Sequence, residues 1–479
     1  MPFPYNIPFL YTIQERMGTT QIPKPLSVFM LTMINVATIG SIKNWPVTAE
    51  YGFSSVFFIL LATLTFFIPS ALVSAELAST FPKLGGVFYW VKKAFGQRLG
   101  FLSAWLLWFQ NIVWYPTILS FVAVTVAYIF NPEFANHKLY TFSTIIICFW
   151  AITLVNLRGM RVSAWISSLG MILGTFLPGL FIIALGTAWF FSDRPSQIEF
   201  NLKSFIPDMS SPNHLALFAG VMLSLAGIEM SAVHAKDVQN PKKDYPKAIL
   251  FSALIILGLS IPGILSIALV VPQGDINLVA GSLQAIAIFL DSYHLKALTP
   301  FLAIFITIGA LASVSTWVSG PAKALLAAAH EGDLPARFKQ TNAHGMPANL
   351  MIFQATIVSI LAFIFIFSPS FNEGLWILSA MLSILYLMMY LLLFASGIIL
   401  RFKEPEVVRP FKIPGGKAGI ISICSLGLLS ALFAIVVGFF PPDQIPIDNI
   451  PLYIAILLGG VILFSTCPLV IFLFRKKIC

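Results

Sequence analysis

Twelve long runs of apolar residues, separated by short polar loops, dominate this sequence. A run of about 20 such residues lets an α-helix cross the hydrocarbon core of a bilayer, where backbone groups must bond within the chain. Only 10% of the 479 residues are charged. We therefore expect an all-α polytopic membrane protein with 12 transmembrane helices. The spans are predicted at residues 27–49, 54–80, 99–130, 139–157, 163–191, 213–234, 247–272, 297–329, 348–367, 374–400, 418–440 and 451–474.

Lysine and arginine are distributed unevenly between the loops. Of the 28 Lys and Arg residues, 23 lie on the side that carries both termini, whereas the opposite loops hold Lys138, Arg194, Lys203 and Lys296. The remaining one, Lys43, lies in the first span. Basic residues gather on the cytoplasmic side of membrane proteins, so both termini are predicted to be cytoplasmic. This bias accounts for the net charge of +9 without a nucleic-acid partner.

The sixth span, FAGVMLSLAGIEMSAVHAKDVQNP, holds an ionisable residue near its middle. A charge at that depth costs about 2.5–3.5 kcal/mol on insertion scales, so Glu229 indicates function. Ser224 and Gly227 precede it, and glycine lets the backbone depart from the helix. An interrupted membrane helix exposes backbone groups that bind solutes. The alternative is a packing glycine beside a structural charge.

The first span repeats this peculiarity. Thr38, Gly40 and Ser41 form a run of small residues, Lys43 follows, and Pro46 cannot donate a helical hydrogen bond. Two broken, charge-bearing helices five spans apart predict two inverted five-helix halves, with a site between the breaks at the membrane midplane.

This symmetry divides the chain into five segments. They are a cytoplasmic N-terminal segment (1–26), a first repeat (27–191), a second repeat (213–400), two extra helices (418–474) and a short cytoplasmic tail (475–479).

Deep polar and aromatic residues in the third and tenth spans are further candidates. Trp108, Gln110 and Asn111 lie too deep to anchor the chain at the interface, and they either line a cavity or pack between helices. Tyr386 and Tyr390, four residues apart, share one helix face. They either face a polar cavity or pack as a stacked pair.

The eighth span carries several hydroxyl groups beside Trp317. Those of Ser313, Ser315, Thr316 and Ser319 either bond to their own helix or coordinate Na⁺. The four cysteines are scattered without CxxC spacing, so we expect no metal site and no disulfide framework.

Several segments resemble a known family. GIEMSAVHAKDVQNPKKDYPKAI resembles the sixth-span signature of the amino acid–polyamine–organocation (APC) superfamily, and SAELASTFPKLGGVFYWV resembles its second-span corner. KNWPVTAEYG, INLVAGSLQ, STWVSGPAKALL and RPFKIPGGK resemble the glutamate/γ-aminobutyrate antiporter family. The likeness extends from about residue 26 to residue 474. It implies a LeuT-type 5+5 inverted repeat followed by two extra helices, amino-acid exchange, and a bacterial inner membrane.

The resemblance also implies substrate roles for Glu229, Trp317, Tyr386 and Tyr390, and Trp108 stands at the aromatic position of the third span. Two positions depart from an acid-resistance antiporter of this family. Lys43 stands where that antiporter has tyrosine, and Ser313 stands where it has glutamate. A cation gained and an anion lost should alter side-chain selectivity. The chain also ends at RKKIC without the long C-terminal plug of that antiporter, so we expect no autoinhibition by a tail.

These observations predict a secondary active amino-acid transporter of the glutamate/γ-aminobutyrate exchanger type, which alternates access around a midplane site. The substrate carboxylate is expected at the N–H groups of Gly40 and Ser41, and its ammonium at the carbonyls of residues 224–227. Lys43 and Glu229 are expected to form an ion pair or to act as separate charges. The candidate substrate-binding residues are Thr38, Gly40, Ser41, Lys43, Trp108, Ser224, Gly227, Glu229, Trp317, Tyr386 and Tyr390.

Two other functions stay open. One is proton-coupled symport with Glu229 as the titrating group, and the other is a membrane amino-acid sensor. The sequence contains no HExxH or GxSxG motif in a context that would indicate an enzyme. We expect no cofactor, and amino acids and the lipid bilayer as partners. Homo-oligomer formation is left open.

Overall fold

The structure is a computed structural model that describes residues 26–478, apart from 132, 135–136, 193, 208–211, 239, 277–280, 364–370, 442–446 and 448. The predicted N-terminal segment lies outside the described residues except for Leu26. Cys479, the last residue of the predicted tail, also lies outside them. The described chain is helical, and its one β-type pairing is an isolated bridge between Leu26 and Val238. The predicted all-α fold is confirmed.

Each predicted span corresponds to one helix or to consecutive helical segments. They are α2 (Val28–Ile39), η1 (Ile42–Asn44) and α3 (Trp45–Ala49); α4 (Ser54–Ala62), η2 (Thr63–Phe67) and α5 (Ile68–Thr80); α7 (Gln97–Phe130); α8 (Lys138–Asn156); α9 (Met160–Met171), η4 (Ile172–Phe176) and α10 (Leu177–Phe190); α12 (Pro212–Ser224) and η5 (Ile228–Asp237); α13 (Pro241–Val270); α15 (Thr299–His330); α16 (Ala348–Ala362); α18 (Phe371–Lys403); α19 (Gly416–Val437); and α20 (Ile450–Ile478).

Shorter helices lie in the connections. They are α6 (Val87–Phe95), α11 (Leu202–Phe205), α14 (Gly281–Ser292), η6 (Lys296–Leu298) and η7 (Ala336–Lys339). Within the described residues, nine helices are long and apolar enough to cross a membrane. The first and sixth spans fall short of that length because each of them is interrupted, and the described part of the ninth span, α16, is also shorter.

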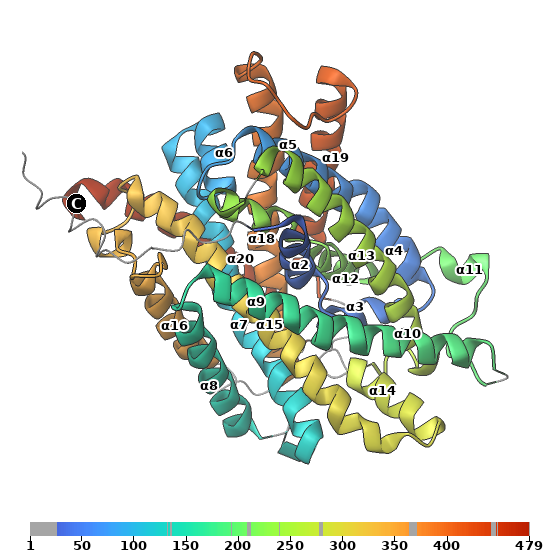
Figure 1. Cartoon of the computed structure of the whole chain (residues 1–479). Coiled ribbons are helices and arrows are strands. Elements are labelled where there is room, and N and C mark those ends of the chain that lie inside the picture. Colours follow the sequence, from blue (N-terminus) through green and yellow to red (C-terminus); the bar gives the residue numbers. More distant parts are fainter. Residues whose placement is uncertain are drawn as a thin grey trace, which may run out of the picture.

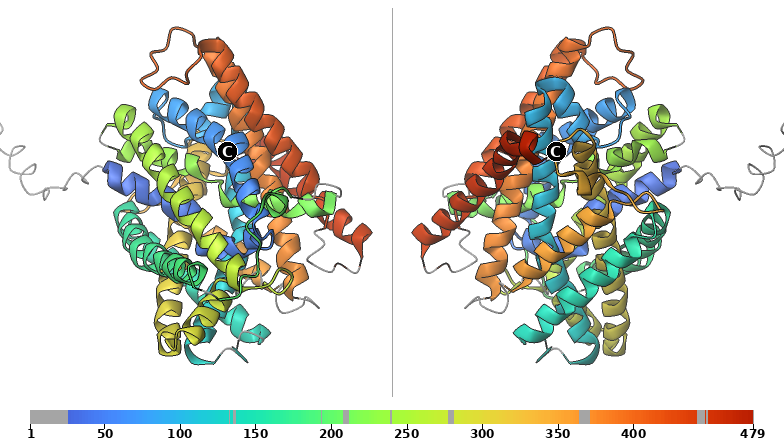
Figure 2. Two further views of the ribbon diagram at one scale, coloured as in Figure 1. Left: turned by 90° about the vertical axis from the view of Figure 1, so that its right-hand side faces the viewer. Right: turned by 90° about the vertical axis from the view of Figure 1, so that its left-hand side faces the viewer.

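In the view of Figure 1, α2 and α12 of the two interrupted spans lie near the centre, and Figure 2 shows that α2 begins at one edge of the bundle. Their contacts are reciprocal: α2 packs against α13, the helix that follows the sixth span, while η5 packs against α5 in the second span. This exchange of partners is the arrangement expected of two inverted five-helix halves. Helices α19 and α20 lie on one side of the bundle, and α9 and α10 lie on the opposite side (Figure 2). The limits of the two repeats stay a prediction.

The contact between α15 and the α9–η4 segment depends on small residues. A Cβ atom on Gly174 would lie 2.0 Å from the backbone nitrogen of Gly309, and one on Gly170 would lie 2.1 Å from Cβ of Ala312. Small residues let membrane helices approach closely enough for backbone contact. This packing fixes α15 beside α2, and therefore positions the side chains that α15 presents to the first helix break.

A buried ionic cluster ties together one end of the bundle. The carboxylate of Glu76 at the end of α5 pairs with Arg401 at the end of α18, through Nε at 2.9 Å and through Nη2. Arg409 approaches the same carboxylate at 3.2 Å, and the backbone N–H of Ile413 donates to it at 2.8 Å. The loop between α18 and α19 is thereby fastened to the second span.

Candidate functional site

The two helix breaks touch each other at Thr38 and Gly227. The Thr38 hydroxyl lies 3.4 Å from the Gly227 carbonyl oxygen. Gly227 has a φ of 121°, a conformation that residues with a side chain rarely adopt. A Cβ atom there would also lie 3.2 Å from the Trp317 ring. The glycine is therefore needed both for the turn and for the close approach of α15.

Side chains of α15 bond to carbonyls at the end of α2. Ser313 donates its hydroxyl hydrogen to the Ala37 carbonyl at 2.7 Å, and Trp317 Nε1 donates to the Thr38 carbonyl at 3.3 Å. The last carbonyls of a helix have no partner within it, so these bonds stabilise the C-terminal end of α2, where the first span is interrupted. Thr316 and Ser319 instead bond to carbonyls of their own helix, each at 3.2 Å.

The free backbone donors of the first break are not the expected ones. The N–H groups of Gly40 and Ser41 bond to carbonyls in the last turn of α2, at 2.6 and 2.8 Å. The expectation that they await a carboxylate is wrong, because the chain tightens there instead of opening. Among the described residues of this break, the unbonded N–H groups are those of the next two residues, Ile42 and Lys43.

The second break offers acceptors. The carbonyls of Ser224, Leu225 and Ala226 have no hydrogen-bond partner among the described residues. The Gly227 carbonyl accepts the Met230 N–H at 3.0 Å. One break thus presents two N–H donors and the other presents three carbonyl acceptors.

Two tyrosines of α18 hold the buried carboxylate of Glu229. Tyr386 donates to Oε1 at 2.6 Å, and Tyr390 donates to Oε2. The Tyr390 hydroxyl also accepts the Gly227 N–H at 2.7 Å. The predicted tyrosine pair therefore acts on the acidic residue and on the break beside it.

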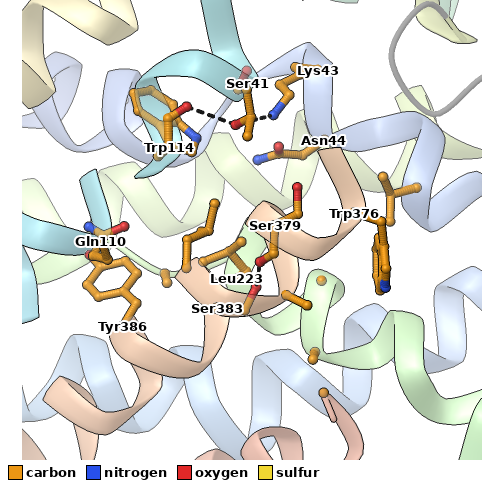
Figure 3. A pocket seen from close by; sticks show the side chains of 18 of the residues that line it. Ser41, Lys43, Asn44, Gln110, Trp114, Leu223, Trp376, Ser379, Ser383 and Tyr386 are labelled. Carbon is orange, nitrogen blue, oxygen red and sulfur yellow. Dashed lines mark hydrogen bonds between the residues drawn. The ribbon is translucent and has the colours of Figure 1, made fainter. Parts of the chain in front are cut away.

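Lys43 and Glu229 do not pair. The Lys43 ammonium donates to the Thr117 hydroxyl on α7 at 3.3 Å, and Figure 3 shows its side chain at the edge of the cavity. Both Glu229 oxygens are taken by tyrosine hydroxyls. The two ionisable residues act as separate charges because each has its own neutral partner.

A cavity of about 130 Å³ lies between the two breaks and helices α7 and α18. It is lined by Thr38, Ser41, Lys43, Asn44, Val47, Gln110, Asn111, Trp114, Thr117, Ala216, Ala219, Gly220, Leu223, Ala226, Trp317, Trp376, Ser379, Ala380, Leu382, Ser383, Tyr386 and Gly438. In Figure 3, Lys43, Ser41 and Asn44 gather at one end of it, while Gln110 and Tyr386 lie together at another.

Five of the eleven candidate residues line this cavity, namely Thr38, Ser41, Lys43, Trp317 and Tyr386. The other six, which do not line it, are Gly40, Trp108, Ser224, Gly227, Glu229 and Tyr390. Gly40 borders a second void of about 10 Å³, room for about one water molecule. Gly227, Glu229 and Tyr390 lie behind the cavity wall and are joined by the bonds described above. Ser224 donates its hydroxyl hydrogen to the Val221 carbonyl of its own helix at 2.7 Å.

Trp108 points away from the cavity and packs between helices. Its ring stacks on Phe353 of α16, with centroids 6.1 Å apart and an interplanar angle of 10°. Gln110 and Asn111, close to it in sequence, line the cavity instead. Of the two readings of this segment, packing holds for the tryptophan and cavity lining holds for the two amides.

Two polar stripes along helices would have revealed further residues. On α7, Gln110, Trp114 and Thr117 follow at spacings of four and three residues, which keeps them on one helix face. On α18, Ser379 and Ser383 continue the same spacing upstream of Tyr386. Extending the tyrosine pair by one turn at a time would have identified both serines.

The described residues contain no group of three or more His, Cys, Asp or Glu side chains that could hold a metal ion. The polar groups at the cavity are hydroxyls, amides, backbone groups and one ammonium. Such groups bind by hydrogen bonds and charge.

A helical membrane bundle with two adjoining broken helices and a cavity between them has the architecture of a secondary transporter. Comparison with known families agrees. The amino acid permease family model matches residues 24–462, and the chain belongs to this family.

Individual members of known transporter groups are also similar to this chain. The chain is 43% identical to an uncharacterized transporter of Legionella pneumophila over 95% of its own length and 97% of the relative's. It is 31% identical to a glutamate/γ-aminobutyrate antiporter of Lactococcus lactis, over 95% of this chain and 91% of the relative. A probable agmatine/putrescine antiporter of the same species is 25% identical over 87% of this chain and 89% of its own.

Proposed function

We propose that this protein is an amino-acid antiporter of the glutamate/γ-aminobutyrate exchanger type. The observation that carries the proposal is the pairing of the two breaks across the cavity. One break has the unbonded N–H groups of Ile42 and Lys43, of which Lys43 lines the cavity. The other has the unbonded carbonyls of residues 224–226, of which Ala226 lines it. A carboxylate needs donors and an ammonium needs acceptors, and every α-amino acid carries both groups. The similarity to the Lactococcus antiporter supports the same function.

In this mechanism the substrate bridges the two breaks. Its carboxylate accepts from the N–H groups of Ile42 and Lys43, and its ammonium donates to the carbonyls beside Ala226. Trp317, which bonds to Thr38 at the first break and packs against Gly227 at the second, lies where the substrate would contact both halves. A bound amino acid would therefore stabilise one relative position of the two repeats.

Alternating access requires that the two ends of the bundle open in turn. On α18 the cavity is lined by residues from Trp376 to Tyr386, whereas the Glu76 cluster engages Arg401. Fifteen residues separate Tyr386 from Arg401, about 22 Å along a helix axis. With the predicted cytoplasmic termini in a bacterial inner membrane, the cavity lies in the periplasmic half and the cluster closes the cytoplasmic end.

Exchange follows when the empty carrier reorients slowly and the loaded one reorients quickly. The difference in binding between two substrates then sets the direction of net movement. Proton-coupled symport is the second candidate, because Glu229 is a buried carboxylate next to a helix break. In that case binding would be coupled to protonation of Glu229 and would not require a second amino acid.

Flux in proteoliposomes separates these functions. Purified protein is reconstituted with or without internal amino acids, and uptake of labelled glutamate is followed with and without a proton gradient. Antiport predicts uptake that needs internal substrate and persists when the gradient is abolished. Uptake into empty vesicles driven by the gradient would establish symport instead, and no flux of any amino acid would overturn transport.

A matched pair of variants shows that flux passes through the cavity. Ala219 lines it, whereas Leu254 is exposed on the outer surface of α13. Ala219→Trp should fill the cavity and abolish exchange, and Leu254→Trp should leave it intact.

A further inference from the structure

The charge of the cavity is unbalanced. Among the described residues that line it, Lys43 is the single side chain with a formal charge. Helix α7 contributes Gln110, Asn111, Trp114 and Thr117, and α18 contributes Ser379, Ser383 and Tyr386. None of these neighbours brings a carboxylate to the ammonium.

The buried carboxylate beside the second break is committed to other partners. Glu229 does not line the cavity, and both of its oxygens accept hydrogen bonds from tyrosine hydroxyls. The described ion pairs do not include Lys43, whose ammonium bonds to the neutral Thr117 hydroxyl. Lys43 is half-buried, and a cation removed from part of its water without a counter-ion is unfavourable, so a ligand that supplies an anion gains affinity.

The two ends of a zwitterion do not remove this imbalance. The N–H donors at Ile42 and Lys43 match one carboxylate, and the carbonyls at the second break match one ammonium. The amino-acid backbone carries no net charge, and it leaves the Lys43 ammonium uncompensated. A second carboxylate would complete the neutralisation at the end where Lys43, Ser41 and Asn44 gather (Figure 3).

We propose that Lys43 makes this transporter selective for substrates with one more carboxylate than ammonium, which are dicarboxylic amino acids such as glutamate and aspartate. The inference rests on the proposed function and sharpens it. γ-Aminobutyrate, with no net charge, is a weaker ligand than glutamate. Agmatine and putrescine are excluded, because their positive charges would meet the ammonium in a site of low dielectric. Thr117 is a positioning residue that holds the lysine at the cavity wall.

Glutamate and glutamine provide the matched pair of ligands, because they share a shape and differ in charge. Their ability to compete with labelled substrate is measured in exchange assays for the wild type, Lys43→Met and Lys43→Arg. The wild type should prefer glutamate by at least tenfold, equivalent to 1.4 kcal/mol. Lys43→Met should lose the preference while retaining glutamine binding, and Lys43→Arg should keep it. Lys92→Met is the control, since Lys92 pairs with Glu331 outside the cavity at 2.7 Å.

The outcomes separate this inference from the proposed function. Equal affinities for glutamate and glutamine in the wild type, or an unchanged ratio in Lys43→Met, would overturn the role of Lys43 while antiport stands. If Lys43→Met does not fold, Thr117→Val replaces it and should reduce the ratio by releasing the lysine. If no amino acid is exchanged, thermal stabilisation by glutamate against glutamine decides, and stabilisation by neither overturns both proposals.

Discussion

The hydroxyl of Tyr390 donates a hydrogen bond to the buried carboxylate of Glu229. The same hydroxyl accepts the N–H of Gly227 at the helix break, so one atom joins α18 to both the charge and the turn. Tyr386 completes the contact at 2.6 Å from the other carboxylate oxygen. Glu229 therefore holds the sixth span against the tenth, and of the two tyrosines Tyr386 also lines the cavity.

The two tyrosines should differ in their effect on stability. Tyr386→Phe removes one hydrogen bond to a charged group, which contributes about 1.5–3 kcal/mol. Tyr390→Phe removes the equivalent bond and also leaves the Gly227 N–H without a partner, which costs about 1–3 kcal/mol more. Apparent melting temperatures in detergent should rank wild type above Tyr386→Phe and Tyr386→Phe above Tyr390→Phe. Equal loss in both variants would contradict the bridging role of Tyr390.

Lys43 and Glu229 should behave independently. They have separate partners, so the effects of Lys43→Met and Glu229→Gln on stability should add within about 0.3–0.5 kcal/mol. A double-mutant cycle on melting in detergent measures this sum. A double variant much more stable than the sum predicts would show that the two charges pair in another conformation of the protein.

The Glu76 cluster should be far more sensitive than a surface ion pair. Glu76→Gln leaves Arg401 and Arg409 buried without their carboxylate, a change that costs about 3–5 kcal/mol. Glu331→Gln, which breaks the more exposed contact with Lys92, should cost about 0.2–1 kcal/mol. Comparable melting temperatures for the two variants would contradict the account of this cluster as the fastening of one end.

Orientation can be tested on two exposed residues. In a cysteine-free background, Lys203→Cys lies in a predicted periplasmic loop and Glu406→Cys in a predicted cytoplasmic one. A membrane-impermeant thiol reagent applied to intact cells should label the first and spare the second, since the basic loops are predicted to be inside. The reverse pattern would invert the predicted topology.

Local signals in the sequence predicted the parts of the fold that depend on local chemistry. The spans follow from apolar length, and the breaks follow from Gly40, Pro46 and Gly227. The sequence does not show which backbone N–H groups stay unbonded at the first break, because that depends on how the backbone turns after Gly40. The N–H of Ser41 bonds back to α2, and no residue type in this segment predicts that contact. For the same reason, the sequence could not show that Trp108 faces α16.

The sequence also could not predict which side chains bond to each other between different helices. Lys43 and Glu229 are opposite charges beside adjoining breaks, and that description favours an ion pair. The tyrosines of α18 and Thr117 of α7 come from distant parts of the chain, and their approach to these charges is set by helix packing. The spacing of Ser379 and Ser383 ahead of Tyr386 is enough to predict that both serines share the tyrosine's helix face. Serine is also common where membrane helices pack, so the residue type alone does not indicate a cavity.

The most direct test of the account is substrate protection inside the cavity. Ser379→Cys places a thiol on its wall, and Lys203→Cys places one outside it. In a cysteine-free background, the rate of alkylation is measured as the concentration of an exchanged amino acid rises. If the substrate binds in the cavity, labelling of Ser379→Cys should slow with a half-maximal concentration equal to that for exchange, while labelling of Lys203→Cys should be unaffected. Undiminished labelling of Ser379→Cys in a variant that still exchanges amino acids would show that the substrate binds elsewhere.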